Sequence, residues 1–139
     1  MSSARDYAGG CLCGAVRYEA QGEPLYQGYC CCGDCRRISG SGFVPFLFFP
    51  ASSVRFGGET KHSIARALRG GDTVRNHCVA CGGLVFGGII GRHAEHSIYA
   101  GSLDDPGLFQ PTIALFMRDK PDWVLLPAGL TVFETMPGQ

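Results

Sequence analysis

The eight cysteines of this chain are the residues best suited to chemistry, and they fall into three clusters. They are Cys11 and Cys13 in C-L-C-G, Cys30, Cys31, Cys32 and Cys35 in Y-C-C-C-G-D-C, and Cys78 and Cys81 in C-V-A-C-G-G. In an extended segment, cysteines two residues apart point to the same side. They cannot form an unstrained disulfide, but both can bind one cation. The spacing therefore indicates metal ligands and suits zinc.

The setting expected for these thiols is reducing. The N-terminal segment M-S-S-A-R-D-Y-A-G-G lacks the apolar core of a signal peptide, and no stretch approaches the roughly 18 apolar residues of a membrane span. We therefore expect a cytoplasmic protein with no membrane partner. Because cytoplasmic thiols are kept reduced, the clusters favour metal binding over a disulfide framework.

Length and charge limit the classes of function. With 139 residues, of which 45% are hydrophobic, the chain is expected to form one domain over residues 1–139. Its 12 basic and 12 acidic residues give a net charge of zero. General binding to nucleic acids or membrane surfaces requires a basic surface, so we expect no such partner. The sequence does not predict an oligomeric state.

The elements that must position the cysteines are mostly strands. Twenty-one glycines and eight prolines divide the chain into short segments with strand signals. The predicted strands are Ala15–Ala20, Phe43–Phe49, Val54–Phe56, Lys61–Leu68, Thr73–His77, Leu84–Ile90, Ser97–Ala100, Thr112–Met117 and Thr131–Glu134. The aromatic run Phe43–Phe49 indicates burial on both faces, and Pro45 places it at a sheet edge or at a strand start. One short helix is expected from about Asp34 to Ser39, with Gly40 as its stop. The fold class is mainly β, with short antiparallel strands and little helix.

The first and third clusters together provide four thiolates. Cys11 and Cys13 precede a predicted strand, and Gly82 and Gly83 after Cys81 permit a tight turn around a metal. Four thiolates make a closed tetrahedral site, which is typical of structural zinc. A small β domain has a limited core, so such a metal would also stabilise its fold.

The middle cluster predicts an open site. Cys30 and Cys32 share one side at the end of a strand, and Cys35 on the short helix can supply a third ligand. Cys31 should point the opposite way, as a small buried apolar residue. Three ligands without a fourth leave a position for water or substrate, which a catalytic zinc requires.

Other assignments of the cysteines remain open at this point. Cys32 and Cys35 could pair with Cys78 and Cys81 as two C-x-x-C motifs, which would leave the first cluster without a metal. An iron–sulfur cluster also takes four thiolates, but its usual spacings differ from these. A redox enzyme could use the adjacent thiols at positions 30–32.

Histidine and aspartate give weaker signals. His93 and His96 form H-A-E-H on an expected loop, without the helical spacing of a zinc protease, so we expect both at the surface. Asp34 lies inside the middle cluster and could accept a proton.

Four sequence segments together resemble a known family. They are G-G-C-L-C-G-A-V-R-Y-E at residues 9–19, C-C-C-G-D-C-R-R-I-S-G at 30–40, C-V-A-C-G-G at 78–83 and A-G-S-L-D-D-P at 100–106. The chain resembles the glutathione-dependent formaldehyde-activating enzyme family, also called the centromere protein V type. This resemblance implies a β-tent fold with two zinc ions per chain. It assigns the structural zinc to Cys11, Cys13, Cys78 and Cys81, and the catalytic zinc to Cys30, Cys32 and Cys35. Cys31 is a departure, because this position is commonly histidine in the family.

The resemblance also implies an activity. The family reaction is that of a carbon–sulfur lyase resembling S-(hydroxymethyl)glutathione synthase, which joins the thiol of glutathione to formaldehyde or a related small aldehyde. Glutathione has two carboxylates, so its cleft should contain guanidinium groups. Arg36 and Arg37 are the preferred candidates because they follow the middle cluster, and Arg66, Arg69 and Arg75 are further candidates. The alternative is a non-catalytic zinc-binding interaction module with two structural metal sites.

Overall fold

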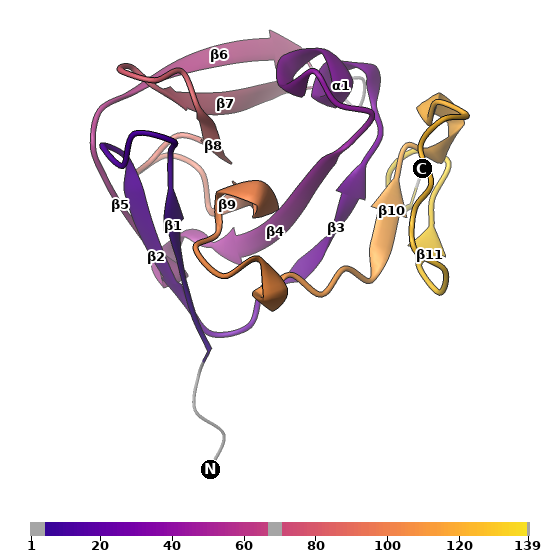
Figure 1. The fold of residues 1–139 in the computed structure, drawn as a ribbon, viewed down its shortest axis with the longest axis horizontal. Helices are drawn as coiled ribbons and strands as arrows, with labels where there is room; N and C mark the ends of the chain where they lie inside the picture. The colour runs from indigo at the N-terminus through magenta and orange to yellow at the C-terminus, as the bar shows by residue number, and fades with distance from the viewer. Residues whose placement is uncertain (1–4, 67–70, 139) are drawn as a thin grey trace.

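The computed structural model describes residues 5–66 and 71–138, which form two sheets joined by short turns (Figure 1). The strands are β1 (Asp6–Gly10), β2 (Arg17–Gln21), β3 (Tyr26–Cys30), β4 (Val44–Pro50), β5 (Val54–Gly57), β6 (Thr60–Arg66), β7 (Asp72–Cys78), β8 (Leu84–Gly87), β9 (Glu95–Tyr99), β10 (Ile113–Leu115) and β11 (Thr131–Val132). The α-helix is α1 (Gly33–Ser39), and the 3-10 helices are η1 (Ala51–Ser53), η2 (Ala100–Ser102), η3 (Pro106–Leu108) and η4 (Met117–Asp119).

The mainly β prediction with little helix is confirmed. The predicted helix is α1, and Gly40 ends it in the left-handed conformation at φ 72°, where its N–H donates to the carbonyl of Arg36 at 2.8 Å. Strand β1 was not predicted, and for β3 only its end at the middle cysteine cluster was expected. The last two residues of the predicted strand Lys61–Leu68 lie outside the described residues.

The larger sheet has the strand order β11-β10-β3-β4-β9-β8-β7-β6, and the smaller sheet has the order β1-β2-β5. The expectation of antiparallel strands is wrong at one end of the larger sheet. There β10 runs parallel to both β3 and β11, pairing Ile113 with Gly28 and with Thr131. The reason is that the chain between β9 and β10 turns through η2 and η3 and then runs in the direction of β3 (Figure 1).

Strand β4 lies between β3 and β9 in the larger sheet, so it is not an edge strand. Pro45 is its second residue and pairs with Tyr29 of β3, whereas pairing with β9 begins only at Phe46. The missing N–H of the proline therefore falls before the pairing with β9. Of the two expectations for Pro45, the strand start is confirmed and the edge is wrong.

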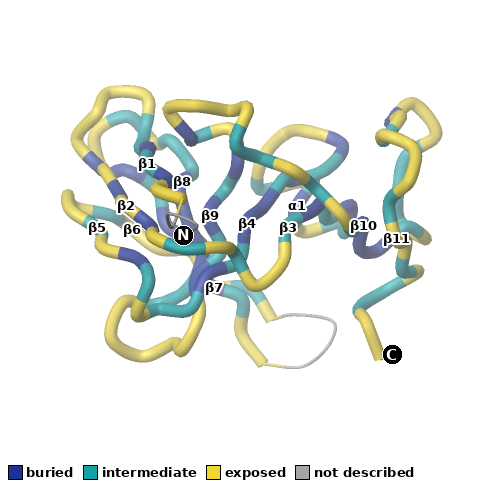
Figure 2. Tube along the Cα trace, turned by 90° about the horizontal axis from the view of Figure 1, so that it is seen from below, coloured by how far each residue is buried: buried dark blue, intermediate teal, exposed yellow. Residues whose placement is uncertain are grey.

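The two faces of β4 contact different groups of buried side chains. Leu47 and Phe49 are fully buried and pack between the sheets with Tyr7 and Tyr18. Phe46, on the other face, packs with Leu115, Phe116 and the side chains of Cys30 and Cys32. The predicted burial on both faces is thus confirmed, and Figure 2 shows the buried residues concentrated on the central strands. One face of β4 stabilises the fold, and the other reaches the middle cysteine cluster.

Within residues 5–66 and 71–138, no helix combines the length and apolar character needed to cross a membrane.

Candidate functional site

The first and third cysteine clusters meet at one point of the structure. Cys11 and Cys13 lie in the turn between β1 and β2, Cys78 ends β7, and Cys81 lies in the turn before β8. The four sulfurs lie within 4.8 Å of one another, with 3.6 Å between Cys11 and Cys13 and 3.7 Å between Cys13 and Cys78. Zinc–sulfur bonds of about 2.3 Å in a tetrahedron place sulfurs about 3.8 Å apart, so these residues fit a zinc ion.

Backbone N–H groups around these sulfurs also suit thiolates. The N–H of Val16 donates to Cys11 at 3.2 Å, and that of Ala80 donates to Cys78 at 3.4 Å. The hydrogen bond from Val16 is the largest cause that lowers the pKa of Cys11, to about 6. Since thiolates are the form that binds metals, this donor set supports a metal at the four sulfurs.

Three cysteines of the middle cluster form the second group. Cys30 ends β3, Cys32 is the N-cap residue of α1, and Cys35 lies in its first turn. Their sulfurs also lie within 4.8 Å of one another, and the N–H of Cys35 donates to the sulfur of Cys32 at 3.3 Å. Hydrogen bonds with Cys30 and Cys35 lower the pKa of Cys32. The two neighbouring thiols thus favour a thiolate at Cys32, and the three converging sulfurs fit a cation between them.

Cys31 is separate from both groups. Its side chain is 0% exposed, and its N–H donates to the carbonyl of Leu115 in β10 at 3.0 Å. Burial raises the pKa of its thiol. The expectation of a buried apolar residue is confirmed, and the arrangement does not favour a redox role for adjacent thiols. The alternative pairing of Cys32 and Cys35 with Cys78 and Cys81 is wrong, because the latter two lie with the first cluster.

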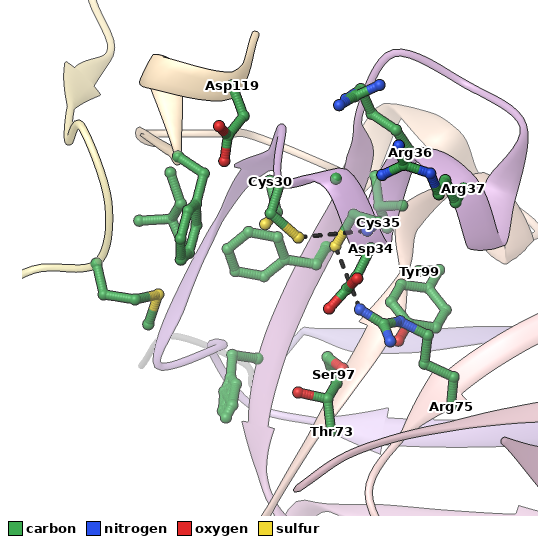
Figure 3. A pocket seen from close by; sticks show the side chains of 18 of the residues that line it. Cys30, Asp34, Cys35, Arg36, Arg37, Thr73, Arg75, Ser97, Tyr99 and Asp119 are labelled. Carbon is green, nitrogen blue, oxygen red and sulfur yellow. Dashed lines mark hydrogen bonds between the residues drawn. The ribbon is translucent and has the colours of Figure 1, made fainter. Parts of the chain in front are cut away.

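Arg75 of β7 contacts the middle cluster from inside the protein. Its side chain is only 6% exposed, and its Nη2 donates to the sulfur of Cys35 at 3.6 Å. Burial is the largest single influence on the pKa of Arg75 and lowers it, but the charge and hydrogen bond of Cys35, together with the charges of Tyr99 and Cys32, raise this pKa above its usual value. In Figure 3 the dashed line from Arg75 to Cys35 marks this contact. A buried guanidinium therefore balances negative charge on the three sulfurs.

The three sulfurs face a pocket of about 440 Å³. Polar residues on one side include Thr73 of β7 and Ser97 and Tyr99 of β9, and Figure 3 shows them near Arg75. Burial raises the pKa of Tyr99 to about 12, so its hydroxyl stays protonated. Much of the remaining lining is apolar and begins on β4, which pairs with β9. The apolar wall, as we call it, consists of Tyr26, Phe46, Phe48, Leu115, Phe116 and Met136.

The candidate arginines differ in their positions. Arg36 and Arg37 line the pocket and approach each other at Gly33, where an added Cβ would lie 2.9 Å from Nη1 of Arg37 and 3.7 Å from Nη2 of Arg36. Arg66 is exposed at the end of β6 and is not a lining residue, and Arg69 lies outside the described residues. Asp34 also lines the pocket.

One histidine expectation is wrong. His93 is exposed, as expected, but His96 lies in β9 and is 2% exposed. Its Nδ1 carries the proton, because it bonds to the carbonyl of Gly87 at 2.9 Å. His96 packs against the rings of Phe56 and Phe86 and belongs to the core.

Sequence reasoning missed most of the pocket. It did not single out Thr73, Ser97 or Tyr99, and it ranked Arg75 below Arg36 and Arg37. A usable signal was present, since Thr73 and Arg75, like Ser97 and Tyr99, lie two apart in predicted strands and therefore share a strand face. It also missed Met136, which reaches the pocket only through the pairing of β11 with β10.

Comparison with known proteins gives a family and a fold. The profile of the family described as "Glutathione-dependent formaldehyde-activating enzyme" matches residues 6–119. The crystal structure of a Rhodobacter sphaeroides protein is similar with a TM-score of 0.53 and 21% sequence identity, over 75% of this chain and 96% of that one. No curated protein matches the sequence.

Proposed function

Because this chain belongs to the glutathione-dependent formaldehyde-activating enzyme family, we propose that it is a zinc-dependent carbon–sulfur lyase that joins a thiol such as glutathione to a small aldehyde. The observation that carries this proposal is the position of Cys30, Cys32 and Cys35 at a pocket with arginines on its polar side. A cluster with only a structural role would not need access to a pocket.

We assign zinc to both sulfur groups. Cys11, Cys13, Cys78 and Cys81 would hold a structural ion, and Cys30, Cys32 and Cys35 would hold a catalytic one. When bound at the latter group, zinc would supply a Lewis acid that favours the thiolate of a substrate or polarises a carbonyl.

The side chains around the middle cluster suit this reaction. Arg36 and Arg37 approach each other beside Gly33, where their guanidinium groups can bind a carboxylate of glutathione. Asp34 lines the same pocket and can accept the proton that the thiol loses. Arg75 balances the negative charge near Cys35.

The reaction balances without a redox partner. A bond forms between the sulfur of the thiol and the carbonyl carbon, and the π electrons of the carbonyl move to its oxygen. The proton lost by the thiol is then returned to that oxygen. Protonated Tyr99 lines the pocket and can donate a hydrogen bond to the oxygen as charge develops there.

The test measures the rate of adduct exchange and the thermal stability of the same protein samples. Zinc-loaded protein should accelerate exchange between glutathione, formaldehyde and their adduct above the spontaneous rate, measured by NMR exchange spectroscopy. Cys35→Ser should abolish this acceleration and retain the thermal transition, with one zinc fewer by elemental analysis. If the protein neither accelerates exchange nor binds glutathione in calorimetry, the proposal is wrong.

The non-catalytic alternative predicts a different outcome. If both metals only stabilise the fold, Cys35→Ser should lower the midpoint of thermal unfolding as much as Cys13→Ser does. Cys13 is a suitable comparison because it belongs to the closed group of four sulfurs.

A further inference from the structure

The apolar wall begins at the cysteines themselves. The side chains of Cys30 and Cys32 pack against the cluster that contains Phe46, Leu115 and Phe116. Tyr26 extends this surface, because its ring stacks on that of Phe48 at 5.0 Å between centroids and 7° between planes. An apolar group attached next to a sulfur in this pocket would therefore meet carbon surface immediately.

Formaldehyde and glutathione leave this surface without a function. Formaldehyde has one carbon and no substituent, and the charged ends of glutathione suit the arginines on the polar side. The pocket of about 440 Å³ falls in the range of roughly 300–1,000 Å³ that is typical of sites for whole small molecules. Water against an apolar wall is released favourably by an apolar ligand. The wall thus fits a substituent that formaldehyde lacks.

The C-terminal segment builds part of the wall. The family profile ends at residue 119, whereas Met136 lies beyond it. This segment returns alongside β10 (Figure 1), where the N–H of Phe133 donates to the carbonyl of Ala114 at 2.9 Å. Phe133 and Met136 both pack against the cluster beside Cys30. The wall is therefore completed by Met136, which lies outside the part that matches the family.

Phe116 has a backbone conformation that bulky residues rarely adopt. Its φ of 56° and ψ of 45° are left-handed, and it is the one described residue other than glycine with positive φ. Two hydrogen bonds to the C-terminal segment hold it: its N–H donates to Thr135 at 3.1 Å, and the N–H of Met117 donates to Phe133 at 3.0 Å. Such conformations persist where the surroundings enforce them, commonly at ligand sites. Here the enforced residue is part of the apolar wall.

We propose that the carbonyl substrate carries an alkyl or aryl group, which binds the apolar wall, and that Met136 determines this specificity. The proposal rests on the proposed function for the thiol–carbonyl reaction. The thiol sulfur bonds to the substituted carbonyl carbon, the π electrons move to oxygen, and the oxygen takes the proton of the thiol. The product is a hemithioacetal with an apolar group beside its sulfur.

The test uses stable analogues of this product. Calorimetry on zinc-loaded protein would measure the dissociation constants of S-methyl-, S-propyl- and S-butylglutathione, and of ethanethiol and butanethiol as ligands without the peptide. The proteins are the wild type, Met136→Ala and the control Met117→Ala. Met117 undergoes the same truncation in the C-terminal half, but it does not line the pocket.

Affinity should rise about fourfold for each methylene that the wall buries. Met136→Ala should flatten this rise and weaken S-butylglutathione about 10-fold, whereas Met117→Ala should behave as the wild type. A wild-type affinity that does not rise with chain length in either series, or a rise that Met136→Ala leaves intact, overturns the proposal.

The two series separate this proposal from the proposed function. If only the alkanethiols bind, and Met136→Ala abolishes the increase of their affinity with chain length, then binding of the alkyl group at the apolar wall is supported and glutathione is the wrong thiol. If the S-alkylglutathiones bind with equal affinity at every alkyl chain length, binding of the alkyl group at the apolar wall is refuted and glutathione remains the assigned thiol.

Discussion

Replacement of Arg75 by methionine tests whether a buried charge would stabilise a metal ion bound at the middle cluster. Methionine keeps an unbranched apolar side chain in β7 but removes the guanidinium, which lies 3.6 Å from the sulfur of Cys35. Three thiolates with a divalent cation leave one negative charge inside the protein. Arg75 is the one positively charged group among residues 5–66 and 71–138 that forms a hydrogen bond with the sulfur of Cys35, so its loss would leave that charge unbalanced.

The magnitude follows from the distance and the burial. Two unit charges 3.6 Å apart attract by about 4 to 5 kcal/mol at an effective dielectric constant of 20. Burial of Arg75 opposes this attraction. Burial is the largest influence on the pKa of Arg75 and lowers that pKa, which disfavours the charged guanidinium. We therefore expect a smaller net loss of zinc affinity, about 10- to 100-fold, as is typical when a partner of a metal ligand is removed.

The assay is chelator competition for the more weakly held zinc, with thermal unfolding of the same samples. Arg75→Lys keeps the charge and should lose much less affinity than Arg75→Met. Arg66→Met is the matched control, because Arg66 is exposed on neighbouring β6 and does not line the pocket. If folded Arg75→Met binds two zinc ions as tightly as the wild type, the charge argument is refuted.

Three further predictions concern the fold. Gly28→Ala should lower the free energy of unfolding by about 1 to 3 kcal/mol in denaturant titrations, because its Cβ would collide with the carbonyl of Ile113, whereas Gly101→Ala has open space and should stay within about 0.5 kcal/mol. Cys78→Ser should lose one zinc per chain by elemental analysis and several degrees of thermal midpoint; unchanged metal content would contradict the structural site. Burial lowers the pKa of His96, so stability should be complete above about pH 6.5 and fall below it, where the unfolded chain binds the proton more readily. His96→Gln should reduce that fall, which is at most about 1.4 kcal/mol per pH unit, and an identical pH dependence would disprove this origin.

The sequence predicted features that depend on local spacing. The cysteine spacings favoured the two groups of sulfurs that the structure brings together, although one other pairing stayed open, and Asp34 to Gly40 predicted α1 and its stop. The nearly continuous apolar run along β4 also indicated that both of its faces are buried. In each case the relevant residues are close in sequence or chemically distinctive.

Features that depend on distant pairing were missed. Strand β3 contains Gly28, which is a weak strand former, but this glycine is required because Ile113 of β10 packs directly against it. His96 was expected on a loop, although the pairing of β9 with β4 and β8 buries it. The parallel pairing of β10 also depends on how the chain returns after η3. None of these contacts leaves a periodic pattern in the sequence.

Strand β7 connects the two sulfur groups, because it carries a residue that contacts each of them. Arg75, which contacts Cys35, and Cys78, which belongs to the other group, are three residues apart, or about 10 Å along an extended strand. Between them, the side-chain amide of Asn76 donates to the carbonyls of Phe86 in β8 and of Gly88, which directly follows β8. These two hydrogen bonds attach β7 to β8. We therefore expect a metal that orders Cys78 to order Arg75 as well. The two ions should bind cooperatively, and linkage requires that each increases the affinity for the other by the same factor.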